Sequence, residues 1–237
     1  MRTIALRTDR SIAIAVGALY VAATLSGVLA ALALGTLASD PLALADLAAG
    51  RARVLTAAFF ELVMAVTVAG VALVIFPVLW SDAHTQGRRG LAVWYLGSRV
   101  TEGAVFLIGI LGLLSLLALA RTVADSGAAP ATYLPVATAL KAFFEYSFVL
   151  GQTVFCVGAF MLYYLLFQSR RVPRWLSVWG LIAAPLMLIA GLLLPFTGDP
   201  NSTVSSILYA PMALQEMVLA VWLIARGFAA PQPEVVR

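Results

Sequence analysis

Six long apolar runs constrain this chain more than any other feature. They cover residues 12–37, 55–80, 91–120, 134–167, 175–196 and 204–225, and each is at least as long as the run of roughly 20 predominantly apolar residues that a helix needs to cross a bilayer. The whole chain is 62% hydrophobic and only 11% charged, which excludes a water-soluble globular protein. The sequence therefore predicts an all-α polytopic membrane bundle of six transmembrane helices, forming one membrane domain over residues 1–237 with a tail at 227–237.

Basic residues predict the orientation of this bundle. If the six helices alternate in direction, ten arginines lie on one side of the membrane, and all five tryptophans lie near the same helix ends. The ten are Arg2, Arg7, Arg10, Arg88, Arg89, Arg170, Arg171, Arg174, Arg226 and Arg237. The positive-inside rule then places both termini in the cytoplasm, as in a multi-pass protein of the bacterial cytoplasmic membrane. This topology accounts for the net charge of +4, so nothing supports a nucleic-acid partner.

Apart from Lys141, at the outer end of the long fourth run, five charged residues lie inside the predicted spans: Glu61, Arg99, Glu102, Glu145 and Glu216. Each charge at the centre of a spanning helix costs about 2.5–3.5 kcal/mol, so we expect these side chains to face the bundle interior and to be paired or neutral. Arg99, Glu102 and Glu216 lie near mid-depth and can meet if their two helices are neighbours. Glu61 and Glu145 lie nearer the outer side and form a second, shallower acidic level.

Helical spacing predicts the inward face of two spans. One face carries Tyr95, Arg99, Glu102, Phe106 and Gly109; the other carries Glu145, Phe148, Gln152, Cys156, Ala159 and Tyr163. Arg99 can neutralise only one of Glu102 and Glu216, so the surplus carboxyl group is expected to carry a proton. A neutral buried carboxylic acid is a competent proton donor to an apolar substrate.

Structural roles are the alternative for each of these groups. Arg99 and Glu102, three residues apart, can form a pair that fixes helix packing, with Glu216 as an interhelical partner. Glu61 and Glu145 can lie in the interfacial zone, and the aromatic stripes can be core packing. The chain has one cysteine and one histidine, His84, and no glycine-rich phosphate loop, so we expect neither a metal site nor a cofactor.

Two motifs carry a resemblance to a known family. They are Arg99-Val-Thr-Glu102, and the helix end Phe167-Gln-Ser-Arg170 with its continuation Arg171-Val-Pro-Arg-Trp-Leu176. The chain resembles a bacterial integral-membrane family described as domain of unknown function 4386. The resemblance implies a six-helix bundle in the cytoplasmic membrane and brings no activity.

A second likeness is to the small membrane-embedded terpene cyclases, which use intramembrane carboxylates to protonate an epoxide or alkene. Glu61 and Glu216 lie in the second and last spans, much as such acids do, although those enzymes have seven spans where this chain has six. This likeness is an analogy of architecture.

These observations favour a membrane-embedded enzyme that protonates a lipophilic, isoprenoid substrate, in the manner of a terpene cyclase or isomerase. The catalytic candidates are the five intramembrane ionisable residues, and the candidates for substrate binding are Phe60, Tyr95, Phe106, Tyr146, Gln152 and Tyr209. The expected partner is a lipophilic small molecule or lipid, and the oligomeric state stays open. The alternatives are a small solute or proton-coupled transporter and a non-catalytic membrane protein that binds a lipid or partner helix.

Overall fold

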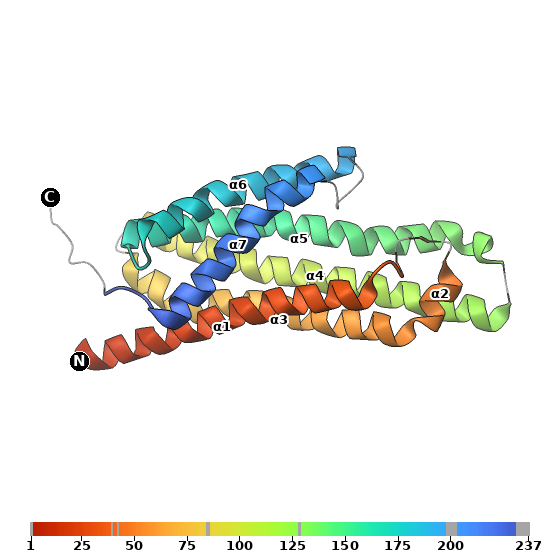
Figure 1. Ribbon diagram of the computed structural model, residues 1–237, viewed down its shortest axis with the longest axis horizontal. Coiled ribbons are helices and arrows are strands. Elements are labelled where there is room, and N and C mark those ends of the chain that lie inside the picture. The colour runs from red at the N-terminus through yellow and green to blue at the C-terminus, as the bar shows by residue number, and fades with distance from the viewer. Residues whose placement is uncertain are drawn as a thin grey trace. The chain divides into compact units, whose positions relative to one another are not determined.

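The computed structural model describes residues 2–38, 40–41, 43–83, 86–127, 129–197 and 203–230, and His84 lies outside them. The described elements are α1 (Arg2–Leu34), α2 (Leu44–Ala49), α3 (Arg51–Asp82), α4 (Gln86–Ser126), the 3₁₀ helix η1 (Pro130–Tyr133), α5 (Leu134–Ser169), α6 (Arg174–Thr197) and α7 (Thr203–Ala225) (Figure 1). Within this part of the chain, six helices are long and apolar enough to cross a membrane. The predicted all-α, six-span membrane bundle is confirmed.

Several helices extend beyond the predicted spans. Helix α4 has 41 residues and α5 has 36; at 1.5 Å per residue α4 is about 60 Å long, about twice the thickness of the hydrocarbon core. Hydropathy detects only the apolar part of such a helix. It misses the polar ends, although the helix continues through them without a break. The first helix ends at Leu34, before the predicted limit at residue 37, because Gly35 adopts the left-handed conformation (φ 53°) that terminates helices.

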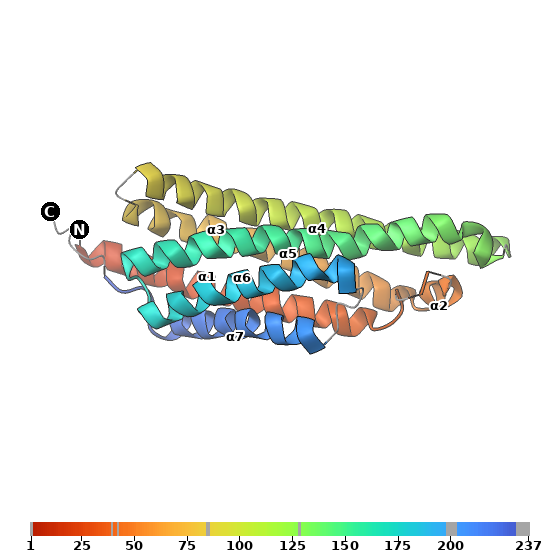
Figure 2. The same cartoon turned by 90° about the horizontal axis from the view of Figure 1, so that it is seen from above.

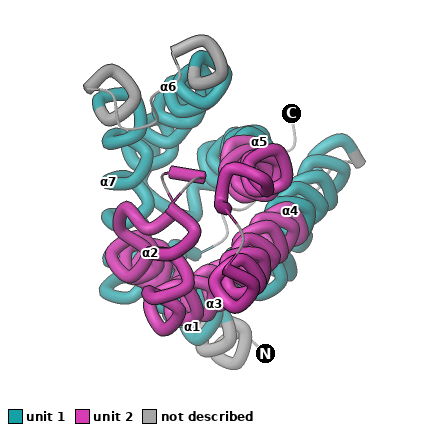
Figure 3. The backbone as a smooth tube through the Cα atoms, turned by 90° about the vertical axis from the view of Figure 1, so that its right-hand side faces the viewer, with its two compact units in different colours: residues 1–21, 67–102, 152–237 teal, residues 22–66, 103–151 magenta. Residues whose placement is uncertain are grey.

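The chain divides into two compact units (Figure 3). Unit 1 comprises residues 1–21, 67–102 and 152–237, and unit 2 comprises residues 22–66 and 103–151. Helices α1, α3, α4 and α5 each contribute one part to each unit, whereas α6 and α7 lie within unit 1.

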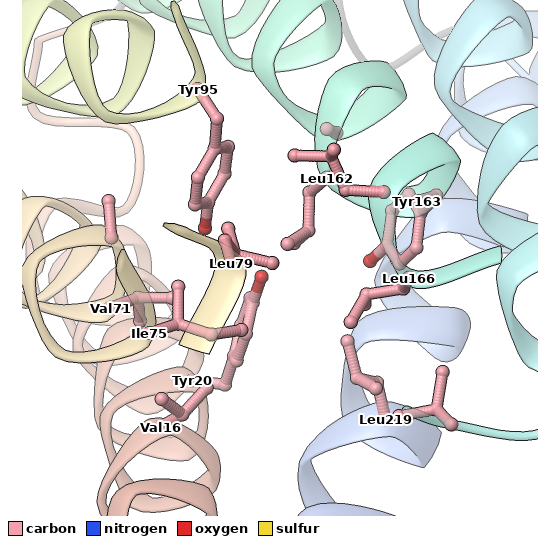
Figure 4. Close-up of a cluster of buried hydrophobic side chains, with 14 of the residues drawn as sticks. Val16, Tyr20, Val71, Ile75, Leu79, Tyr95, Leu162, Tyr163, Leu166 and Leu219 are labelled. Atoms are coloured by element: carbon pink, nitrogen blue, oxygen red, sulfur yellow. The ribbon is translucent and has the colours of Figure 1, made fainter. Parts of the chain in front are cut away.

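The core of unit 1 is built from α1, α3, α4, α5, α6 and α7. Its labelled members in Figure 4 are Val16, Tyr20, Val71, Ile75, Leu79, Tyr95, Leu162, Tyr163, Leu166 and Leu219. Helices α6 and α7 lie side by side (Figures 1 and 2). Helix α6 approaches α5 closely at Gly180, where the Tyr163 ring fills the space that a Cβ atom would occupy.

One end of unit 1 is held together by Arg171, which lies between α5 and α6. Its guanidinium donates two hydrogen bonds to the carboxylate of Asp82, at 2.6 and 2.7 Å, and one to Asp9 at 2.8 Å. It also donates to the carbonyl oxygen of Ala229 at 3.0 Å. These bonds connect α1, the end of α3, the α5–α6 connection and the segment after α7, which are the ends predicted to share one side of the membrane.

A second arginine joins α1 to α7 at the same end. Arg10 donates hydrogen bonds to the carbonyl oxygens of Leu223, Ile224 and Ala225, at 3.3, 2.7 and 3.3 Å. A cation at these carbonyls also complements the negative end of the helix dipole.

Unit 2 has its own apolar core, formed by one face of α4 against α2 and parts of α1, α3 and α5. Its buried members are Ala38, Leu44, Leu47, Val54, Ala58, Ile110, Leu113, Leu116, Leu117, Ala120, Val123 and Ala137. The short helix α2 lies between the first two predicted spans. Leu44 and Leu47 bury their side chains in this core, which accounts for the helix.

Candidate functional site

Helix α4 buries a polar stripe in unit 1. Tyr95, Arg99 and Glu102 follow one another turn by turn and are 1%, 2% and 3% exposed. Arg99 and Glu102 form an ion pair, with 2.9 Å between Nη1 and Oε2. Further along the same face, Phe106 is buried within unit 2. The inward face predicted for this span is confirmed.

Helix α5 covers this stripe with aromatic and polar side chains. The guanidinium of Arg99 lies over the ring of Phe155, 4.9 Å from its centroid. Such a cation–π contact is stronger where water is excluded. Gln152 and Cys156 are one turn apart on α5, on either side of Phe155 in the sequence, and both are buried.

Helix α7 adds a second carboxyl group. Glu216 interacts electrostatically with both Arg99 and Glu102, and with Cys156 of α5. The residue is half-buried, and its Oε1 atom has no accessible surface. Arg99, Glu102 and Glu216 therefore come close enough to interact in unit 1, a meeting that the sequence left conditional.

Three buried tyrosines belong to the same core of unit 1. Tyr20 of α1 and Tyr95 of α4 point toward one another, and the Tyr163 hydroxyl of α5 points into the interior of unit 1 (Figure 4). Tyr163 donates a hydrogen bond to Oε1 of Gln215 at 2.5 Å, and Gln215 Nε2 donates to the carbonyl oxygen of Leu176 at 3.1 Å. Gln215 thus links α7 to both α5 and α6.

Sequence reasoning missed Gln215. It is neutral, so a search for intramembrane charges passes over it, although it is fully buried in the structure. A buried amide without a hydrogen-bond partner is energetically costly. A glutamine within an apolar span was therefore the sequence feature that could have predicted a buried hydrogen bond here.

Three buried atoms at or near this stripe have no hydrogen-bond partner among the described residues: Nε of Arg99, Nε2 of Gln152 and Oε1 of Glu216. The Tyr95 hydroxyl faces that of Tyr20 and interacts with it, and Glu102 Oε2 has the ion pair but no hydrogen bond of good geometry. We call Tyr95, Arg99, Glu102, Gln152 and Glu216 the Arg99 cluster. Each unpaired buried group costs about 1–3 kcal/mol, and buried polar groups are normally paired. The cluster therefore offers donors and an acceptor to a bound polar group.

The other predicted site residues do not share one compact unit with the cluster, except Tyr209. Tyr209 is half-buried on α7, two turns before Glu216. Glu61 lies in unit 2, half-buried between the buried residues Ala57 and Ala65. Phe60, also half-buried in unit 2, packs edge-on against Phe59 with ring centroids 5.4 Å apart.

The expectation that Glu145 faces the bundle interior is wrong. Glu145 is exposed and accepts a hydrogen bond from Lys141 Nζ at 2.5 Å. Tyr146 is 54% exposed as well. In this part of α5 the buried positions are Ala137, Ser147 and Gly151, so the interior face lies to one side of the predicted stripe. Gln152 and the later positions of that stripe are buried as predicted.

Comparison with known proteins identifies the family. A family model described as "Domain of unknown function (DUF4386)" matches residues 15–227, so the chain belongs to that family. No curated protein and no solved structure matches the chain. The match contains every residue of the Arg99 cluster.

Proposed function

Because the family's description names no activity, the geometry of the Arg99 cluster is the basis for a function, and we propose that this chain is a membrane-embedded enzyme. It protonates a lipophilic substrate of the isoprenoid class inside the bilayer. Glu216 is the acid, Glu102 is the base and Arg99 holds Glu102 in place. The observation that carries the proposal is the buried, unpartnered Oε1 of Glu216 beside a complete ion pair.

Charge counting supports the role of Glu216. Arg99 and Glu102 neutralise each other at 2.9 Å, so an ionised Glu216 would leave one net negative charge in a buried, low-dielectric site. Such an uncompensated charge is far more costly than a neutral carboxylic acid. Glu216 therefore holds a proton that it can give to a substrate.

The reaction balances without any other reactant. The O–H bond of Glu216 breaks, and the π electrons of a substrate double bond form a C–H bond with that proton. The adjacent carbon becomes a cation, and a second double bond of the isoprenoid closes a ring by attacking it. Glu102 then removes a proton from the carbon beside the final cation, which restores a double bond. Proton return from Glu102 to Glu216 resets the site, and the product is an isomer of the substrate.

Aromatic rings support the cationic stage. The ring of Phe155 lies against the guanidinium of Arg99, and Tyr95 and Tyr20 belong to the same buried core of unit 1. Aromatic faces attract cations most strongly in dry surroundings. Arg99 does not oppose this cation because Glu102 balances its charge. We also infer that the protein lies in the bacterial cytoplasmic membrane with both termini inside, since the basic residues gather at that end.

Substitution of the acid tests the proposal. The purified protein in lipid nanodiscs is incubated with a panel of linear polyprenyl lipids, and isomerised products are identified by gas chromatography and mass spectrometry. Loss of a general acid costs about 10²–10⁴-fold in rate, so we expect Glu216→Gln and Glu102→Gln to lose turnover by that factor. Glu145→Gln is the matched control, because Glu145 is exposed and paired with Lys141 on the same helix, away from the cluster's unit.

Two outcomes would overturn the proposal. Turnover by Glu216→Gln at the wild-type rate would remove the acid. A polyprenyl lipid that is retained by the wild-type protein but never altered would show a binding protein in place of an enzyme. Unchanged thermal unfolding of Glu216→Gln keeps a loss of activity from being a loss of fold.

A further inference from the structure

An apolar groove runs along the outer face of α7. It has a volume of about 350 Å³ and is lined by Met217, Val218, Val221, Trp222, Ala225 and Arg226. These residues recur at steps of one and three or four, so they share one side of the helix. Val221, in the middle of the groove, is 61% exposed. The volume falls in the range of about 300–1,000 Å³ that is usual for small-molecule sites.

The groove has the length of one lipid leaflet. Nine residue steps separate Met217 from Arg226, which corresponds to about 13 Å along a helix. Half of the hydrocarbon core of a bilayer is about 15 Å thick. A chain lying in the groove would therefore reach from the membrane surface at Arg226 to about the bilayer centre at Met217.

The surface end of the groove is positively charged. Arg226, which lines the groove at this end, is exposed.

A tryptophan pair lies at the same level. Trp222, which lines the groove, packs edge-on against Trp175 of α6 with ring centroids 6.5 Å apart. Tryptophan rings at this depth are typical of the headgroup region.

We propose that this groove binds an anionic phospholipid of the surrounding bilayer. One acyl chain lies along Val218 and Val221, and the phosphate lies at Arg226. This site lies on the outward side of α7 and involves no member of the Arg99 cluster, so it stands independently of the proposed enzyme. An anionic lipid is favoured over a zwitterionic one because the groove ends at the exposed cationic side chain of Arg226.

Lipid retention measures this site directly. The protein is exchanged into micelles with phosphatidylglycerol or phosphatidylcholine of identical acyl chains, and bound lipid is counted by native mass spectrometry. We expect the wild-type protein to retain phosphatidylglycerol preferentially. Each arginine near a membrane surface contributes about fivefold to the binding of anionic lipid, so Arg226→Gln should lose about that factor. Val221→Trp, which fills the groove, should lose the preference altogether.

Matched variants separate the groove from the general lipid surface. Arg121→Gln removes an exposed charge from α4, and Val66→Trp enlarges a 63%-exposed apolar position on α3; both should retain lipid like the wild type. Equal retention of the two lipids by the wild type would overturn the proposal, and so would wild-type retention by both Arg226→Gln and Val221→Trp. A dimer that dissociates in Val221→Trp would show instead that a second copy covers the groove.

Discussion

At the scale of single residues, Arg171 shows how little a sequence says about the surroundings of a charge. Arg170, Arg171 and Arg174 look alike as markers of the basic side, but Arg171 is only 3% exposed and binds two carboxylates. Burial alone lowers the pKa of Arg171, and the hydrogen bonds and charges of Asp82 and Asp9 outweigh it, so this pKa lies above its ordinary value. The guanidinium therefore stays charged and keeps its partners.

Removal of this side chain should destabilise the protein. Arg171→Ala leaves the carboxylates of Asp9 and Asp82 without their cation, and breaking such a buried pair costs about 3–5 kcal/mol. Arg171→Lys should recover part of the loss, because an ammonium keeps the charge but not the two-pronged bond to Asp82. Tryptophan fluorescence during unfolding measures the free energies, and an Arg171→Ala variant as stable as the wild type would contradict this role.

At the scale of helices, periodicity predicted the buried face of α4 correctly and part of α5 wrongly. The α4 stripe of Tyr95, Arg99 and Glu102 is buried because it continues through one packed face. On α5 the same extrapolation assigned Glu145 to the interior, where the structure has it exposed and paired with Lys141. The spacing of residues along a helix cannot show which side the neighbouring helices cover when that side changes along its length.

The close approach of α5 and α6 leads to a second prediction at the scale of helices. Gly180 of α6 has the Tyr163 ring where a Cβ atom would lie, whereas Gly97 of α4 has nothing within 4 Å. Gly180→Ala should therefore cost about 1–3 kcal/mol through overpacking. Gly97→Ala should be neutral or stabilising, because alanine favours the helix. The two free energies of unfolding, measured side by side, give the comparison, and equal effects would contradict the α5–α6 packing.

At the scale of the whole molecule, composition and charge placement were enough to predict six membrane-spanning helices and their common basic end. The Arg171 and Arg10 bonds show that the ends of α1, α3 and α7 do meet in unit 1. The division into two units, the short helix α2 and the partner of Gln215 were not predictable, because they depend on tertiary contacts that hydropathy does not record. The sequence also could not show which carboxyl group of the cluster lacks a partner.

The orientation in the membrane can be tested with single cysteines. The native Cys156 is 2% exposed, and a Cys156→Ala background removes it. Asp46→Cys in α2 should react with a membrane-impermeant maleimide on intact cells. Gly87→Cys at the start of α4, where nothing lies within 4 Å, should react only after permeabilisation. Labelling of Gly87→Cys on intact cells would contradict cytoplasmic termini.

The most direct test of the proposed mechanism follows the proton that Glu216 transfers to the substrate. The protein is equilibrated in D₂O and then mixed with less than one equivalent of the polyprenyl lipid that it converts, so that each molecule turns over once, and the product is weighed by mass spectrometry. If the Glu216 carboxyl group protonates the substrate, the wild-type product carries one deuterium bound to carbon, and Glu216→Gln forms no such product. A wild-type product without carbon-bound deuterium, or the same labelled product from Glu216→Gln, would contradict the account.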